Sequence, residues 1–155
     1  MKKFTLFFIF FFFIFNIEGN AKTTRLKGIN QVDLLVEQLT EYAEKCSITK
    51  EKIETAAKYV LQNSKIKLSE APLTPLLYIQ VIVIKNGDTC SVYSSLTVET
   101  FTNAPFNSEN RGSFVYYKND RISSGGINSN IGKFVIDNIE EMMKDLVVTH
   151  HEDNQ

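Results

Sequence analysis

The stretch LLYIQVIVIKNGDTCSVYSSLTVETFTN, residues 76–103, contains the strongest fold signal in the chain. Two runs rich in β-branched residues flank Asn86-Gly87-Asp88, and Asn-Gly supplies the positive φ angles that tight hairpin turns need. The sequence therefore predicts a β-hairpin. The first arm of this hairpin is apolar at nearly every position, which predicts a central strand that is covered on both faces.

The second arm of the hairpin alternates between apolar and polar residues, which predicts one buried and one outward face. The residues on the predicted buried face are Cys90, Val92, Leu96 and Val98. The residues on the predicted outward face are Thr89, Ser91, Tyr93, Ser95, Thr97 and Glu99. An exposed face around Tyr93 is a candidate binding surface for a partner, although a sheet face that simply meets water is the commoner case.

Helical periodicity predicts two helices, one before and one after the hairpin. The first follows Thr49, whose hydroxyl suits an N-cap, and ends at Asn63-Ser64. Its apolar positions have the spacing of one helical face, and they are Ile53, Ala56, Ala57, Val60 and Leu61. The second is predicted from about residue 130 to residue 149, and it buries Ile131, Val135, Ile139, Met142 and Leu146.

The remaining segments predict shorter strands and loops. INQVDLLVEQL, residues 29–39, fits both a strand and a helix, and we favour a strand for its first part. KIKLS (65–69) predicts a short strand with Ile66 and Leu68 on one side, and SFVYYK (113–118) predicts another. Residues 103–112 predict a polar loop, and residues 119–130 predict a turn-rich link.

These elements predict an α+β fold. We expect a single domain over residues 22–149, with a mixed or antiparallel sheet of about five strands in the order β-α-β-β-β-β-α. Both helices are expected to pack on one face of the sheet. Residues 150–155 are expected to form a flexible tail.

The first 21 residues have the layout of a secretory signal peptide. Two lysines precede an apolar run from Phe4 to Phe15, and a short polar region ends in Gly19-Asn20-Ala21. This pattern predicts cleavage after Ala21. An uncleaved membrane anchor is the alternative, but a helix needs about 20 apolar residues to cross the bilayer, so we expect no stable membrane insertion.

Export agrees with the rest of the composition. Without Lys2, Lys3 and Glu18, the remaining 15 basic and 17 acidic residues give a net charge of −2. Nothing in this balance attracts nucleic acid. The chain also has no Asn-x-Ser/Thr sequon, which favours a bacterial over a eukaryotic export route. We therefore expect a periplasmic or secreted bacterial protein.

Cys46 and Cys90 are the two cysteines of the chain, and three states are open to them. Cys46 lies just before a predicted helix, where the helix dipole favours a reactive thiolate. A nucleophile also needs a base, and the only histidines are His150 and His151 near the C-terminus. Two buried free thiols are the second possibility. A disulfide is favoured, because paired cysteines in small exported domains are usually oxidised.

Other chemistry has weaker support. HHED (150–153) contains adjacent histidines, but closed metal sites draw ligands from separated, rigid positions. SSGGINSN (123–130) precedes a helix, yet it lacks the spacing of a phosphate-binding loop. Glu140 and Glu141 are adjacent on a helix and therefore diverge. We expect no catalytic, cofactor-binding or metal-ligating residues, and we expect that the protein is not an enzyme.

Two segments together resemble a loose group of small exported bacterial proteins of unassigned function. They are GINQVDLLVEQLTEYAEKCSIT (28–49) and LLYIQVIVIKNGDTCSVYSSLTV (76–98). The shared pattern is Gly-Ile, an alternating strand ending in Val-Glu-x-Leu, an apolar-Thr helix entry and a Leu-Tyr strand that opens a hairpin. Ser47 stands where that group has glycine. The resemblance implies export and an α+β order, and it implies no catalytic residues.

The sequence thus favours a non-enzymatic interaction module of the cell envelope. Its partner would be an unidentified protein or envelope component. The alternative is a small-molecule binding protein with a pocket between the sheet and the last helix, lined by Met142 and Met143. Methionines at helical spacing are more often core residues.

Overall fold

A computed structural model describes residues 25–71, 74–104, 107–127 and 130–155, with side chains outside residues 102–111. The predicted signal peptide, residues 1–21, lies outside the described residues. The strands are β1 (Gln31–Val36), β2 (Lys67–Leu68), β3 (Leu76–Asn86), β4 (Thr89–Ala104) and β5 (Asn107–Gly126). The helices are the 3-10 turn η1 (Glu44–Cys46), α1 (Lys50–Gln62) and α2 (Ile131–Asp153).

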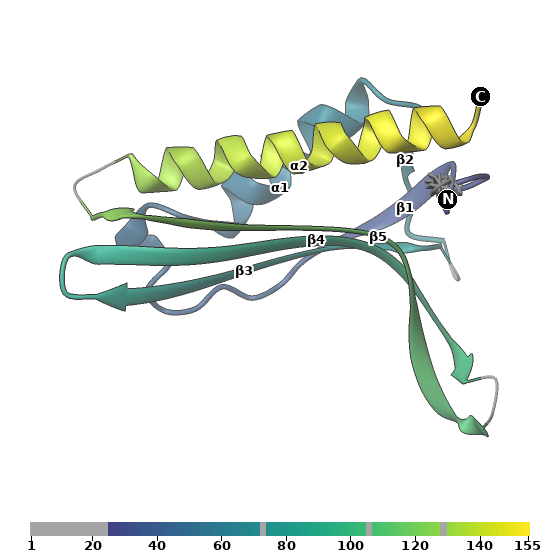
Figure 1. Ribbon diagram of the computed structural model, residues 1–155, viewed down its shortest axis with the longest axis horizontal. Helices are drawn as coiled ribbons and strands as arrows, with labels where there is room; N and C mark the ends of the chain where they lie inside the picture. Colours follow the sequence, from purple (N-terminus) through teal and green to yellow (C-terminus); the bar gives the residue numbers. More distant parts are fainter. Residues whose placement is uncertain (1–24, 72–73, 105–106, 128–129) are drawn as a thin grey trace, which may run out of the picture.

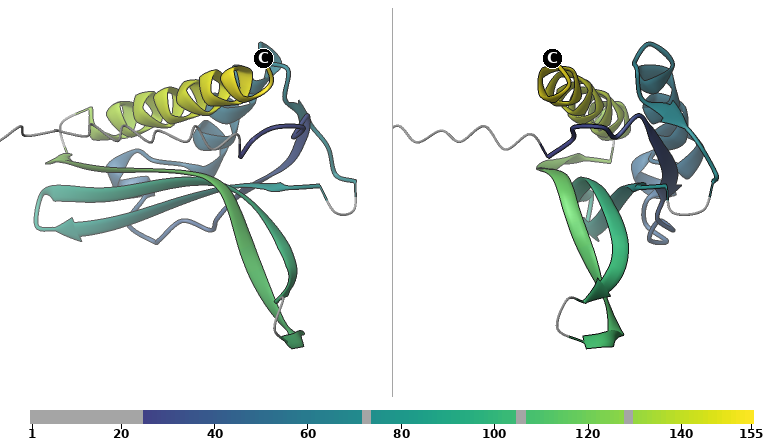
Figure 2. Two further views of the ribbon diagram at one scale, coloured as in Figure 1. Left: turned by 45° about the vertical axis from the view of Figure 1, so that its right-hand side comes forward. Right: turned by 90° about the vertical axis from the view of Figure 1, so that its right-hand side faces the viewer.

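The five strands form one mixed sheet in the order β2-β1-β3-β4-β5. β1 is parallel to β2 and to β3, whereas β3, β4 and β5 pair antiparallel. Both helices lie on the same face of the sheet (Figures 1 and 2). The predicted α+β class, the order of elements and the one-sided packing are therefore confirmed.

The predicted hairpin is the β3–β4 pair. Asn86 pairs with Thr89, so the turn has two residues, and Gly87 as the first of them has φ +57°. This is the position at which a two-residue turn requires a glycine. The turn fixes the register, which brings Val83 opposite Val92 and Leu77 opposite Val98. The buried face of the hairpin is thereby aligned across both strands.

The prediction that β3 is covered on both faces is wrong. Leu77, Ile79, Val81 and Val83 are buried under the helices, whereas Ile82 and Ile84 on the other face are 37% and 62% exposed. The apolar run predicted two covers because it has no polar face. Both helices pack on the same side, so the second face of β3 stays uncovered.

The predicted polar loop and turn-rich link around β5 are also wrong. β4 continues to Ala104, and β5 runs from Asn107 to Gly126, so most of both segments is strand. Residues of the predicted link pair in register with β4, for example Gly125 with Cys90 and Arg121 with Ser94. A long neighbouring strand supplies backbone hydrogen bonds whatever the local propensity, which explains why a polar, glycine-containing segment is extended.

Helix α1 confirms its prediction in detail. The backbone N–H of Lys52 donates to Oγ1 of Thr49 at 3.4 Å, and the helix ends at Asn63. Ile48 and Ile53 on either side of the cap are fully buried, as a hydrophobic staple requires. In the segment 65–69, only Lys67–Leu68 is strand, and Ile66 is buried while Leu68 is exposed, so these two side chains do not share a side as predicted.

Helix α2 is longer than predicted. Its buried positions include all five predicted ones, but it continues to Asp153. The flexible tail predicted for residues 150–155 is therefore wrong for most of its length, because His150 and Asp153 are 3% and 6% exposed. No helix in the described ranges is both long enough and apolar enough to cross a membrane.

Candidate functional site

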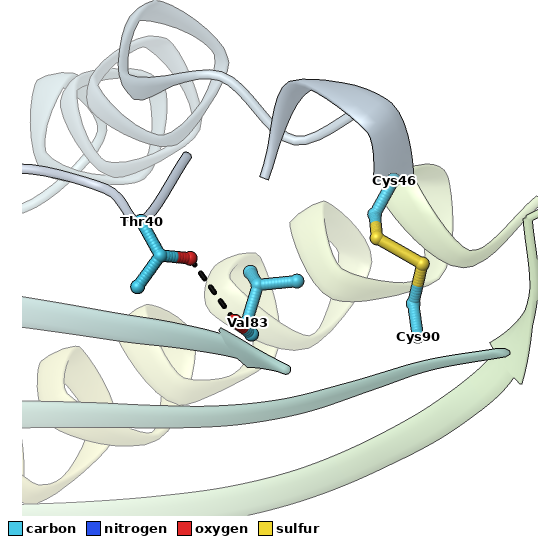
Figure 3. Close-up of a disulfide and its surroundings, with 4 residues drawn as sticks. All are labelled: Thr40, Cys46, Val83 and Cys90. Carbon is cyan, nitrogen blue, oxygen red and sulfur yellow. Dashed lines mark hydrogen bonds between the residues drawn. A yellow bond between two sulfur atoms is a disulfide. The ribbon is translucent and has the colours of Figure 1, made fainter. Parts of the chain in front are cut away.

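A disulfide joins Cys46 at the end of η1 to Cys90 at the start of β4, with the two Cα atoms 6.3 Å apart (Figure 3). Both residues are fully buried. Next to the bond, Oγ1 of Thr40 donates to the carbonyl of Val83 at 3.0 Å. The segment between β1 and α1 is thus fastened to the hairpin, and Cys46 is a structural residue rather than a nucleophile.

Ser47 and Gly132 meet where η1 ends and α2 begins. Ser47 has the left-handed conformation, with φ 62°, and its carbonyl oxygen would lie 2.5 Å from a β-carbon at position 132. Only glycine fits there, because real β-carbons do not approach another atom so closely. The first turn of α2 therefore rests directly on the segment that carries the disulfide.

The last residues of the chain hold the first described segment. The buried backbone N–H of Leu26 donates to Oδ2 of Asp153 at 3.0 Å. The side chain of Asn154 adds two bonds, accepting from the N–H of Gly28 at 2.9 Å and donating to the carbonyl of Leu26 at 3.2 Å. This contact between residues over 120 positions apart explains why the C-terminus is ordered.

The two histidines do not act as a pair. His150 is buried whereas its neighbour His151 is exposed and lies next to Gln155, because adjacent helical residues point in different directions. In the described part of the chain, no three His, Cys, Asp or Glu side chains come close enough to bind a metal ion.

The paired carboxylates of α2 also separate. Glu140 lies near Lys144, and Glu141 accepts from Nη1 of Arg121 at 2.6 Å. Nη2 of Arg121 also lies 3.4 Å from a carboxylate oxygen of Asp145. Arg121 on β5 therefore links to two acids of α2, Glu141 and Asp145. Their arrangement is that of ion pairs at the edge of the core rather than an acid–base pair.

The sheet face opposite the helices carries an apolar row. Ile82, Tyr93 and Ile122 are direct cross-strand neighbours on β3, β4 and β5. Ile122 is 83% exposed and Ile82 is 37% exposed. The face around Tyr93 is therefore only partly open to solvent, because Ser95 and Thr97 on the same face are buried.

A polar cluster adjoins this row. Oη of Tyr93 donates to Asp120 at 3.0 Å, and Nζ of Lys118 lies 3.0 Å from the same carboxylate. Burial opposes ionisation of Asp120, but hydrogen bonds from Ser95, Lys118 and Tyr93 outweigh it and lower the pKa of its carboxyl. The hydrogen bond to Asp120 also raises the pKa of Lys118. Both groups are therefore held in their charged forms.

The β4–β5 hairpin extends past the other strands as an arm, which we define as residues 99–104 and 107–116. At its base Val98 pairs with Tyr117 but Glu99 pairs with Val115, so β5 has one extra residue, Tyr116. Such a β-bulge bends a strand. Figure 1 shows the arm leaving the sheet and turning away from the helices.

The arm exposes aromatic side chains. Phe101 is 61% exposed and Phe114 is 54% exposed, and the Phe114 ring stands edge-on to that of Tyr116 with centroids 4.9 Å apart. Val115 is also exposed, by 39%. Phe101 pairs with Ser113 and Phe114 pairs with Thr100, so the two rings lie on opposite faces of the arm.

Two concave regions lie beside α2. The larger is a groove of about 790 Å³ between α1 and α2, lined among others by Lys52, Tyr59 and Lys133. The smaller, of about 470 Å³, lies between β5 and the end of α2. Met142 and Met143, predicted to line a pocket, are instead fully buried in the core.

The arm and the uncovered face were only partly visible in the sequence. The alternation around Tyr93 predicted an outward face, which the structure confirms for Thr89 and Ser91, whereas Ser95 and Thr97 are buried. Phe101 and Phe114 flank the predicted loop of residues 103–112, so their place on one projecting hairpin became visible only from the pairing of β4 with β5. No local signal identified Gly132, whose constraint comes from a residue 85 positions earlier.

No family model matches this chain, and no curated protein matches it. Among solved structures, it is similar to a minor lipoprotein from Acinetobacter baumannii, with 14% identity, a TM-score of 0.37, and coverage of 78% of this chain and 90% of that chain. It is also similar to the rare lipoprotein B from Shewanella oneidensis, with 10% identity, a TM-score of 0.34, and coverage of 79% and 95%. At these TM-scores neither similarity carries an argument about function.

Proposed function

We propose that this protein is a non-enzymatic interaction module of the bacterial cell envelope that binds another protein through the arm. The observation behind the proposal is the exposure of Phe101 and Phe114 on a hairpin that bends away from the body of the domain. Exposed aromatic side chains are a cost to a free protein, and they are the commonest anchors of protein–protein interfaces.

The proposed location outside the cytoplasm is supported by the disulfide and by the predicted signal peptide. Disulfides persist in oxidising compartments such as the periplasm and are rare in the cytosol. The Cys46–Cys90 bond is buried in the core, so it belongs to the folded domain rather than to a surface redox switch.

A photo-crosslinking experiment in intact bacterial cells tests the proposal. A photoreactive phenylalanine analogue is placed at position 114 in one variant and at position 134 in another. Phe134 lies on α2 and is 53% exposed, against 54% for Phe114, so the two sites are matched in residue type and exposure. We expect a discrete crosslinked protein from position 114 and none from position 134.

Two outcomes would contradict the proposal. One is the absence of any crosslinked protein from position 114. The other is the same set of products from position 134, which would mean that the arm has no selectivity. In a third variant the analogue is placed at position 115, and the double substitution Phe101→Ser and Phe114→Ser should abolish its crosslink while the urea midpoint stays unchanged, because both rings face solvent.

A second candidate function is small-molecule binding, and the groove between α1 and α2 favours it. Its volume of about 790 Å³ lies within the size range of ligand sites, and its lining combines the Tyr59 ring with two lysines, Lys52 and Lys133, and two acids, Glu51 and Glu140. A thermal-shift screen against small metabolites tests it. A stabilising compound should lose its effect in the Tyr59→Ala variant, and a uniformly flat screen would count against this function.

A further inference from the structure

β5 is a long edge strand. It is the last strand of the sheet order and has 20 residues, and among the described strands only β4 pairs with it. Its inner face is bound to α2, for example by the bond from Nδ2 of Asn138 to Oγ of Ser123 at 2.9 Å. An edge strand of this length presents a row of backbone donors and acceptors that can pair with another strand.

One backbone hydrogen bond fixes which residues of β5 point their N–H and C=O groups toward the free edge of the sheet. The N–H of Ile127 donates to the carbonyl of Asp88 at 2.7 Å, next to the pairing of Gly126 with Thr89. Backbone groups alternate in direction along a strand. The N–H and C=O groups of Asn119 and Arg121 therefore point toward β4, and those of Lys118, Asp120 and Ile122 point toward the outer edge.

The residues whose backbone groups point toward the outer edge carry opposite charges on the two sides of Asn119. Lys118 and Asp120 flank Asn119, and Ile122 lies two residues beyond Asp120 on the same face of β5. If a second β5 runs antiparallel with Asn119 opposite Asn119, then Lys118 of each copy faces Asp120 of the other.

We propose that two copies of this chain associate through β5, in antiparallel register with the two-fold axis at Asn119, to form one continuous ten-stranded sheet. A two-fold axis repeats every contact, so one self-complementary strand supplies the whole interface. Lys118 and Asp120 exchange both backbone hydrogen bonds across the interface, because both point their backbone groups outward.

The side chains of β5 favour pairing with a second copy of β5 over pairing with an unrelated strand. Lys118 and Asp120 are 53% and 39% exposed and form an ion pair with each other at 3.0 Å within one copy. In this register each of them also lies opposite the other residue of the second copy, so the four charges alternate in sign. Opposite charges directly across two strands stabilise the pair, and like charges destabilise it. Ile122, at 83%, is the most exposed large apolar side chain described, and a second copy paired along this edge would lie beside it.

The inner-face charges do not need to rearrange. Arg121 is held within its own copy by Glu141 and Asp145, at 2.6 and 3.4 Å. Charged side chains on an edge strand can also discourage pairing. Whether the charges of β5 favour or discourage pairing depends on their order. In this register Lys118 of one copy attracts Asp120 of the other, and reversing the sign of either residue would make the contact repulsive.

Charge reversal with sedimentation velocity tests the proposal on protein purified from the periplasmic fraction. The unaltered protein should sediment as a concentration-dependent dimer over the micromolar to millimolar range. Lys118→Asp and Asp120→Lys should each raise the dimer Kd about tenfold, because each reversal turns two attractive pairs into repulsive ones. The double reversal Lys118→Asp with Asp120→Lys restores both pairs and should restore the Kd.

A cysteine scan supplies the second readout. Asn119→Cys should form a disulfide-linked dimer under mild oxidation, because residues directly opposite in an antiparallel pair have Cα atoms within disulfide reach. Val115→Cys, at an exposed position of the same strand, faces a different residue of the second copy and should remain monomeric on a non-reducing gel.

Three results would overturn the proposal. The first is a monomer at every concentration, and the second is a dimer whose Kd is unchanged by either single charge reversal. The third is an Asn119→Cys variant that crosslinks in cells to a different protein rather than to a second copy of itself. The proposal does not rest on the function of the arm, since the crosslinks from position 114 are measured separately and can be present or absent in either case.

Discussion

Removal of the Cys46–Cys90 bond should lower the stability of the domain by a large share of its total. The bond links η1 to β4, and both cysteines are fully buried. Reduction of the natural protein leaves both side chains in place, so it isolates the covalent link. The double substitution Cys46→Ala with Cys90→Ala removes the link without introducing buried hydroxyls.

The size of the effect follows from the loop that the bond closes. The two cysteines are 44 positions apart, and in the chain-entropy model a loop of this length gives about 4 kcal/mol of stabilisation. A small domain has a free energy of unfolding of about 5–15 kcal/mol in total. At an m-value of about 2 kcal/mol/M, the urea midpoint should fall by about 2 M.

Far-UV circular dichroism in a urea titration measures this change in oxidised protein, reduced protein and the double alanine variant. Thr40→Val is the matched control, because it removes only the neighbouring bond to Val83 and should cost about 1 kcal/mol. A loss below about 1 kcal/mol on reduction would refute the reasoning, since the cross-link would then not restrict the unfolded chain. Equal losses for reduction and for Thr40→Val would refute it as well.

Three further predictions concern single side chains. Gly132→Ala should destabilise the fold by about 1–3 kcal/mol in a urea titration, although alanine favours helices, because its β-carbon would meet the carbonyl of Ser47; equal stability would show that α2 can shift. Asp153→Ala should cost about 1–3 kcal/mol by leaving the buried N–H of Leu26 unpaired, and Asp153→Asn, which keeps an acceptor, should cost less; equal losses would argue against the hydrogen bond. The pKa of Asp120 is lowered by folding, so its contribution is present above about pH 4 and is lost as pH falls through the lowered pKa. Asp120→Asn should therefore weaken the acid dependence of the urea midpoint, and an unchanged dependence would contradict this.

Periodicity alone predicted the elements whose side chains meet the core directly. Helix α1 and its Thr49 cap, the buried stripe of α2 and the inner face of β4 follow from spacing, because a helix or strand beside one core must repeat its apolar residues at its own period. The turn at Gly87 followed from the φ angles that a two-residue turn needs. The disulfide was favoured because the chain has two cysteines and one of them faced inward.

Polar segments could not be read in this way, because their conformation depends on distant partners. The residues of β5 around Arg121 resemble a linker, and they are extended because β4 offers them a ladder of backbone bonds. Asp153 resembles part of a tail, and it is ordered because the N–H of Leu26 needs a buried acceptor.

By itself, the sequence determined the class of fold, the hairpin, the helices and the favoured pairing of the cysteines, since each depends on residues close together in the chain or on a small set of alternatives. Only the tertiary structure decided that the outer face of β3 stays uncovered, where the arm bends and which edge strand of the described sheet lies outermost. Those features depend on the register and pairing of strands that are far apart in the chain, and no short stretch of residues encodes them.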